Sequence, residues 1–168
     1  MLKIIQATSA EQFAQFHELV DEFRAWDSEM SRSVGLDVDT VLNHFYKGSP
    51  ADPAAGDSRM ERAFIVTYGG QLGGCGAVKK LSDQVAELTR VYVRPAYRGK
   101  GLARAVVVAI IESARDMGYA SLCLETAVFM KDAQALYRSL GFEPTQPFRP
   151  LPDDLKEAEV FMKLELRT

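Results

Sequence analysis

The sequence predicts an α+β fold in which helices flank a mixed, mostly antiparallel sheet. Three strand-like runs between residues 62 and 93 are separated only by short turns, which is typical of an antiparallel meander. Helical spacing of apolar residues follows at 102–117, then a strand-like run at 120–126 and a second helical segment at 131–140. A last strand-like run occupies 158–166. Helices that alternate with strands pack in layers around one core, so we expect all 168 residues to form a single domain.

The first part of the chain predicts one strand, one long helix and one short helix. Residues 2–8 are strand-like, and Thr8–Glu11 or Ser9–Gln12 offers a capping box where the long helix begins. Its apolar residues recur at three- and four-residue steps and therefore share one buried face: Phe13, Phe16, Val20 and Phe23. A second helix is predicted at 39–46, and the content of Pro, Gly, Ser and Asp predicts a loop at 47–59.

Glycine and proline predict where the remaining elements end. Gly69-Gly70 supplies the positive φ angles of a two-residue hairpin turn. Gly118 and Gly141 follow helical segments and are expected to end them. Four of the seven prolines lie in 144–152, which predicts a rigid loop before the last strand.

The composition is that of a globular protein without a bound metal. Apolar residues make up 47% and charged residues 26% of the chain, and no apolar run approaches the length of about 20 residues that spans a bilayer. The start lacks the pattern of a signal peptide, so a cytoplasmic location is expected. Cys75 and Cys123 lie in apolar strands, which indicates core packing, and two distant histidines with so few thiols do not predict a zinc site.

A basic cluster stands out in a chain whose net charge is -3. The segment between Leu88 and Ile111 contains five basic residues and no acidic one: Arg90, Arg94, Arg98, Lys100 and Arg104. Gly99 and Gly101 lie within it at the start of a helix, where free backbone N–H groups and the helix dipole bind phosphate. Neither a dinucleotide fingerprint nor a P-loop fits, because arginines occupy the positions at which these motifs need glycine. A Gly-x-Gly alone is also compatible with a simple turn.

The wider context adds a family resemblance. The segment ELTRVYVRPAYRGKGLARAVV resembles the central motif of the GNAT family of acyl-CoA-dependent N-acyltransferases, with Arg98, Gly101 and Ala103 in the motif positions. The later segment AQALYRSLGF resembles the family's helix that carries a tyrosine before a Gly-Phe pair. The similarity runs from about Ala63 to the end of the chain. It implies a three-layer α/β/α fold and acetyl-CoA as the acyl donor.

The resemblance also assigns residues to coenzyme A. The pyrophosphate would lie on the glycine loop, and the pantetheine arm would pair with the preceding strand like an extra strand. The residues implied are Val91, Tyr92, Val93, Arg98, Gly99, Lys100, Gly101, Leu102, Ala103 and Arg104. Met130 stands where many members have an asparagine that touches the pantetheine arm, so this contact is either absent or supplied by backbone.

Two residues are expected to carry the chemistry. An amine of pKa about 10.4 is neutral in only one molecule in 2500 at pH 7, so its proton must be removed before attack. By resemblance Glu87 takes this proton, commonly through water; the alternative is a strand carboxylate that is exposed or paired with Arg90. By resemblance Tyr137 protonates the leaving thiolate, and the alternative is a packed helix tyrosine. Strand N–H groups near Val91 would stabilise the oxyanion.

Two other functions remain open from the sequence. The chain could be a catalytically degenerate module that binds acyl-CoA for regulation, or a nucleic-acid-binding protein, which the acidic balance disfavours. The expected acceptor is a small-molecule or peptide amine. Seven acidic and two basic residues between Glu18 and Asp39 favour a cationic one, although solvated helix faces would look the same. A homodimer is compatible with the resemblance, and no nucleic-acid or membrane partner is expected.

Overall fold

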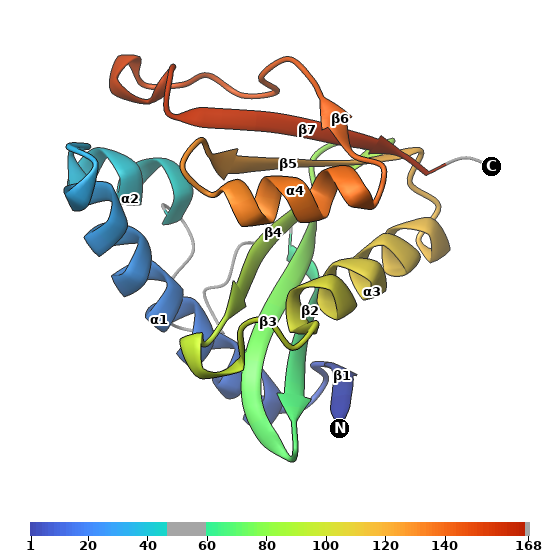
Figure 1. Ribbon diagram of the computed structural model, residues 1–168. Coiled ribbons are helices and arrows are strands. Elements are labelled where there is room, and N and C mark those ends of the chain that lie inside the picture. Colours follow the sequence, from blue (N-terminus) through green and yellow to red (C-terminus); the bar gives the residue numbers. More distant parts are fainter. Residues whose placement is uncertain (47–59, 167–168) are drawn as a thin grey trace.

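The computed structural model describes residues 1–46 and 60–166 and contains one sheet with helices on both faces (Figure 1). In the described part, seven strands are ordered β1-β2-β3-β4-β5-β7-β6. The strands are β1 (Leu2–Gln6), β2 (Met60–Tyr68), β3 (Gln71–Lys80), β4 (Val85–Val93), β5 (Ser121–Ala127), β6 (Glu143–Pro144) and β7 (Glu159–Glu165). The helices are α1 (Ala10–Ser33), α2 (Val38–Tyr46), α3 (Leu102–Asp116) and α4 (Lys131–Ser139). Among the strands of the described residues only β4 and β5 pair in parallel, so the predicted mixed, mostly antiparallel sheet is confirmed.

The local signals for helix starts agree with the structure. Ser9 is the N-cap of α1 and forms a reciprocal capping box with Gln12, one of the two pairs that the sequence offers. The helix α2 begins at Val38, one residue before the expected start, because the Asp37 carboxylate accepts hydrogen bonds from the N–H and hydroxyl of Thr40. The predicted loop at 47–59 lies outside the described residues.

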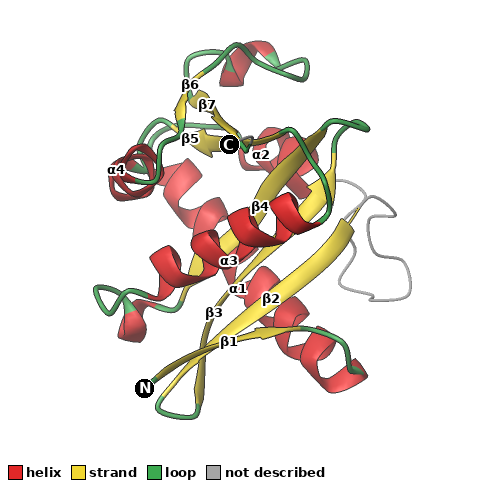
Figure 2. Ribbon diagram, turned by 90° about the vertical axis from the view of Figure 1, so that its right-hand side faces the viewer, coloured by secondary structure: helices red, strands yellow, loops and turns green. Residues whose placement is uncertain are grey.

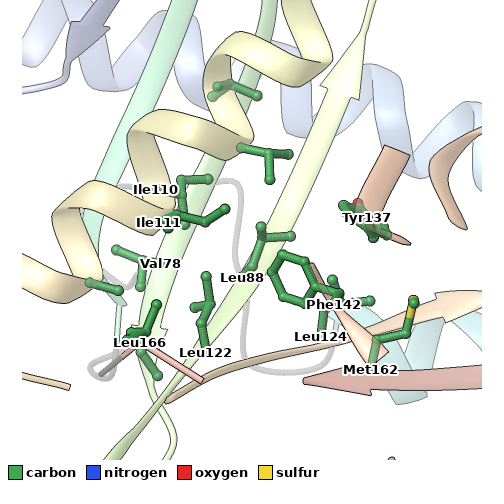
Figure 3. Packing of buried hydrophobic residues seen from close by; sticks show 14 of the residues in the cluster. Val78, Leu88, Ile110, Ile111, Leu122, Leu124, Tyr137, Phe142, Met162 and Leu166 are labelled. Atoms are coloured by element: carbon green, nitrogen blue, oxygen red, sulfur yellow. The ribbon is translucent and has the colours of Figure 1, made fainter. Parts of the chain in front are cut away.

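The two larger of the three hydrophobic clusters in the described residues lie on opposite faces of the sheet. One packs α3 and α4 against strands β2 to β5 and β7 (Figure 3), with Val106, Val107 and Ile110 fully buried. The other packs α1 against β2, β3 and β4 and includes Phe16 and Leu19. Figure 2 shows α3 in front of the sheet and α1 behind it. Cys75 and Cys123 are both free and buried, as the interpretation of core packing predicts.

A bulge in β4 changes which side chains face α3. Thr89 is opposite Ala77 and Tyr92 is opposite Cys75, so β4 has one residue more than β3 over this stretch. Arg90 lies in the bulge with a φ of 59°, which is uncommon for a residue other than glycine. Before the bulge Leu88 packs toward α3, whereas after it Val91 and Val93 do. Before the bulge the even-numbered side chains of β4 face α3, and after it the odd-numbered ones do.

Strands β4 and β5 diverge beyond the bulge. Their described pairing is limited to Val85–Glu87 of β4 and Ser121–Cys123 of β5. Beyond these residues β5 pairs with β7 along its whole length, while β4 continues with β3 alone (Figure 1). The edge of β4 from Leu88 to Val93 is thus open toward β5, and backbone N–H and C=O groups there need partners other than a strand.

Candidate functional site

The glycine loop presents the start of α3 to the open side of β4. Gly99 and Gly101 have φ angles of 79° and 87°, and Gly101 is the N-cap of α3 with no side-chain cap. A Cβ at Gly101 would meet no atom within 4 Å, so glycine is needed here for its backbone conformation and not for space. The first N–H groups of a 15-residue helix consequently point outward without a capping side chain, which makes them available to an anion.

The five basic residues of the sequence cluster do not act together. Arg94 forms ion pairs of 2.6 Å with both Glu18 and Glu22 of α1. Arg90 donates to the Phe45 carbonyl oxygen of α2 at 2.9 Å. Two of the five thus bind groups of the first two helices and not the loop.

The remaining three basic side chains surround the loop. The Arg98 guanidinium lies 5.4 Å from the centre of the Trp26 ring and donates to the Val93 carbonyl oxygen. The Lys100 ammonium lies 5.5 Å from the Tyr68 ring, and Arg104 donates to the Ser139 hydroxyl at 2.8 Å. The backbone of the loop and these three side chains form the positively charged end of the site.

A cleft of about 440 Å³, the main cleft, begins at this loop and follows the open edge of β4. Its walls come from α1, β4, the glycine loop, the start of α3 and α4, with the following lining: Phe23, Trp26, Met30, Val91, Tyr92, Val93, Tyr97, Arg98, Gly99, Leu102, Ala103, Phe129, Met130, Lys131, Asp132, Ala133, Leu136 and Tyr137. Most of the residues assigned to the cofactor by resemblance are among them, Met130 included. Lys100, Gly101 and Arg104 belong to the loop but do not line the main cleft.

The wall from α1 was not predicted. Phe23 packs against the core cluster of α1, as the sequence predicts, but it also stacks on Tyr92 at 5.5 Å between ring centres and lines the main cleft. Trp26 and Met30 continue the same helix face at steps of three and four residues. This spacing was the available signal, but an apolar face that lines a cleft has the same pattern as one that lines a core.

Tyr137 lies where the main cleft meets the interior. Its side chain is 6% exposed, it packs edge-on against Phe142, and burial raises its pKa well above the ordinary value. The hydroxyl therefore stays protonated at neutral pH and can donate a proton.

Two further cavities continue from the main cleft between β4 and β5. The small cavity, about 70 Å³, shares Phe23, Val91, Phe129, Met130 and Tyr137 with the main cleft. The charged cavity, about 300 Å³, shares Phe45, Thr89, Arg90 and Glu125 with the small cavity. The three spaces thus follow one another through the divergence of the two strands, and we call them together the passage.

Glu87 lies at the charged cavity, not beside Tyr137. Its side chain is 4% exposed and binds the Arg149 guanidinium, with the Lys79 ammonium 3.8 Å away. Arg149 also reaches Glu125 at 3.0 Å, so one arginine joins β4 to β5. The alternative interpretation of Glu87 as an ion-pair member has support here, although its partners differ from the expected Arg90. Arg149 belongs to the proline-rich loop, where nothing in the sequence marked it.

Three carboxyl groups line the small cavity. Burial raises the pKa of Asp27, which accepts a hydrogen bond from the Tyr46 hydroxyl at 3.3 Å. Burial, followed by the nearby charges of Glu125 and Asp27, raises the pKa of Glu159 to about 9. Glu125 lies 2.6 Å from the His44 ring nitrogen. Asp27 is the one acidic residue of the Glu18–Asp39 segment that lines this cavity.

Within 1–46 and 60–166, no group of three or more His, Cys, Asp or Glu side chains could hold a metal ion. In the same residues, none of the helices has the length and apolar character needed to cross a bilayer.

Comparisons with known proteins agree with this geometry. The profile of the acetyltransferase (GNAT) family matches residues 16–142. The uncharacterized N-acetyltransferase YjgM of Escherichia coli K12 is 42% identical over 83 residues, which are 48% of this chain and 50% of that protein. The match thus spans about half the length of this relative.

Solved structures match over almost the whole chain. A Klebsiella pneumoniae protein described as an acyl-CoA N-acyltransferase superposes with a TM-score of 0.71, 27% identity and 99% coverage of both chains. The Salmonella typhimurium protein yncA, solved with its cofactor acetyl-CoA, has a TM-score of 0.67 at 20% identity, with 99% of this chain and 94% of that chain covered. The second likeness concerns the fold alone.

Proposed function

This chain belongs to the acetyltransferase (GNAT) family, and we propose that it transfers an acetyl group from acetyl-CoA to a primary amine by direct attack in a ternary complex. The family membership makes an acyltransferase the expected activity class. The solved neighbour that contains acetyl-CoA supports the same donor here. The acceptor class rests on the residues of the passage.

The main cleft offers complementary groups for each part of the donor. The uncapped start of α3 and the side chains of Arg98, Lys100 and Arg104 suit the pyrophosphate. The open edge of β4 suits the pantetheine arm, whose amides would complete the backbone hydrogen bonds that β5 leaves unmade. Met130 and Phe129 form an apolar wall instead of the asparagine contact of many relatives.

The thioester end of the donor would then lie next to Tyr137 and the small cavity. The neutral amine attacks the thioester carbonyl carbon, and a β4 backbone N–H near Val91 stabilises the oxyanion. As the C–S bond breaks, the Tyr137 hydroxyl supplies the proton that the thiolate needs. A carboxylate of the passage takes the proton that the ammonium loses; Glu87, Glu125 and Glu159 all line it.

One observation carries this proposal: a continuous cleft leads from the anion-binding loop along the open edge of β4 to a buried, protonated tyrosine. The test combines calorimetry with CoA and acetyl-CoA and a free-thiol release assay with a panel of amines. We expect binding of both nucleotides and amine-dependent thiol release. Binding without turnover of any amine would favour the regulatory module instead, and absence of binding would contradict both.

A further inference from the structure

We propose, on the basis of the proposed function, that the small cavity binds the terminal ammonium of an unbranched primary amine and that Glu159 takes the proton this group loses. The cavity lies between the main cleft and the charged cavity. An acceptor that enters from the charged cavity must place its reacting nitrogen here to reach the thioester beside Tyr137.

The size of the small cavity restricts what enters it. Its volume is about 70 Å³. This is less than a quarter of the volume of the charged cavity, so we expect a nitrogen on an unbranched carbon to be accommodated better than one with a carbon branch beside it. The charged cavity, about 300 Å³, has room for the remainder of the acceptor.

The charge of the small cavity favours a cation. Three carboxyl groups line it against one guanidinium, that of Arg90, which already donates to the Phe45 carbonyl oxygen and lies 4.9 Å from the Tyr46 ring centre. Burial raises the pKa of two of these groups, Asp27 and Glu159, and an ammonium with three donors would stabilise their ionised forms.

One oxygen of the Glu159 carboxyl lacks a hydrogen-bond donor, although the carboxyl interacts with that of Glu125. Asp27 accepts a hydrogen bond from the Tyr46 hydroxyl, and the Glu125 carboxylate contacts His44 and Arg149. The Glu159 Oε2 atom is buried and accepts no hydrogen bond from the described residues. Glu159 lies two residues from Phe161, the partner of Glu125 in the β5–β7 register, so both acidic side chains share one face of the sheet.

The basicity of Glu159 also suits the transfer. An ordinary glutamate at pKa about 4.3 would hold the proton of a lysine-like amine at 10.4 only about once in a million. Burial and the neighbouring acidic groups raise the pKa of Glu159 to about 9 in the absence of a bound cation, so it is a stronger base than an ordinary glutamate. A bound ammonium favours the ionised form and so releases the proton that Glu159 carries at pH 7. The titratable or charged groups that line the cavity with Glu159 are Asp27, Tyr46, Arg90, Glu125 and Tyr137.

Glu87 is less suited to this role. It lines the charged cavity, which Tyr137 does not reach, and its carboxylate already binds Arg149 and lies near Lys79. Its contacts instead hold Arg149 across the opening of the passage.

The proposed transfer begins when the protonated amine enters the small cavity. Entry of R–NH₃⁺ displaces the Glu159 proton to solvent, leaving a carboxylate beside the ammonium. An N–H bond then breaks as an O–H bond forms on Glu159. The neutral nitrogen forms a C–N bond with the thioester carbon, the C–S bond breaks, and the thiolate takes the Tyr137 proton. Tyr137 regains a proton from the nitrogen of the new amide, and Glu159 keeps the proton that it took from the ammonium.

The experiment compares nucleophiles and variants at pH 7 by thiol release. The nucleophiles are n-butylamine, which is cationic, sec-butylamine, which is cationic but branched, and methoxyamine, which is neutral. The variants are Glu159→Gln, Glu87→Gln and, as a matched control, Glu157→Gln at an exposed position two residues away. Calorimetry with CoA and thermal unfolding show that each variant folds and binds the donor.

We expect the wild type to use n-butylamine at least tenfold better than sec-butylamine. Glu159→Gln should lower kcat/KM for n-butylamine about 100-fold, within the usual range for a general base, and change methoxyamine turnover less than threefold. Equal losses with both nucleophiles, no loss with n-butylamine, or the same selective loss in Glu87→Gln would overturn the inference. A wild type that binds acetyl-CoA but turns over no nucleophile would instead contradict the proposed function.

Discussion

The Arg149 guanidinium lies 3.0 Å from the Glu125 carboxylate of β5. The same guanidinium contacts the Glu87 carboxylate of β4, so Arg149 links the two strands. The two carboxylates are 1% and 4% exposed, and Arg149 is 23% exposed. Replacement of Arg149 by Met would leave two buried carboxylates that have lost their shared cation. We expect the free energy of unfolding in urea to fall by about 3 kcal/mol. Arg104→Met, which removes a surface arginine, should change it by less than about 0.5 kcal/mol.

The Arg149 prediction has an internal control. In the triple variant Arg149→Met, Glu87→Gln, Glu125→Gln, no unpaired carboxylate remains at this position, so part of the lost stability should return. A triple variant that is less stable than Arg149→Met alone would show that the arginine does not act through these two carboxylates.

The positive φ of Gly101 permits a direct test of the anion site. Gly101→Ala and Gly118→Ala impose the same strain, since the two φ angles are 87° and 86° and neither Cβ would meet an atom within 4 Å. Both variants should lose about 1 kcal/mol of stability. Only Gly101→Ala, at the start of α3, should also weaken CoA binding in calorimetry, by about tenfold, which is 1.4 kcal/mol. Equal affinities would place the pyrophosphate elsewhere.

Gly74 of β3 pairs with Val93, the residue of β4 that follows the bulge pair Cys75–Tyr92. A Cβ at this position would come within 2.7 Å of the Tyr92 carbonyl oxygen, so Gly74→Ala must displace the strand that forms one wall of the main cleft. We expect weaker CoA binding together with a lower melting temperature. Gly76→Ala meets mainly the end of the Ile110 side chain, at 2.9 Å, and should lower stability with a smaller effect on binding.

Tyr137→Phe tests the proton donor. The variant keeps the packing against Phe142, so CoA affinity should stay within twofold, while kcat falls 10²- to 10⁴-fold, the range for loss of a general acid. Because burial raises the pKa of Tyr137, the wild type should show no loss of kcat from ionisation of this hydroxyl up to about pH 10, the ordinary tyrosine value. A decline below that pH that is absent in Tyr137→Phe would contradict the assignment.

Glu159 should also make stability depend on pH. Its folded pKa of about 9 exceeds the reference value of 4.5, so between these values the folded protein holds a proton that the unfolded chain has released. Stability must therefore fall as pH rises through this window, by up to roughly 1.4 kcal/mol per pH unit. Glu159→Gln removes this dependence. The stability difference between the variant and the wild type, measured in urea, should shift in favour of the variant from pH 5 to pH 8; a constant difference would show an unshifted Glu159.

The sequence predicted the elements well because their signals are local. The capping box at Ser9, the Gly69-Gly70 turn and the glycines after α3 and α4 each act within a few residues. The glycine loop and the position of Tyr137 on the main cleft followed from motifs of the same local kind.

The rest of the site depends on contacts between distant segments. Arg149 and Glu87 are 62 residues apart, and Arg94 meets Glu22 across 72 residues. The sequence suggested at most a pair within one strand, Glu87 with Arg90, because composition does not show which distant partner the fold brings near. The elevated pKa of Glu159 likewise requires burial beside acidic groups of other elements, which its alternating strand pattern cannot reveal.

The divergence of β4 and β5 has a consequence for the solubility of the protein. Strands with unpaired backbone groups usually lie at the border of a sheet, where they can recruit another chain and aggregate. Here the unpaired stretch from Leu88 to Val93 lies in the middle of the sheet, between β3 and β5. Side chains of α1 and α4 line the space beside it. A neighbouring molecule cannot insert a strand there without displacing them, so the unpaired edge is shielded from pairing with a strand of another chain.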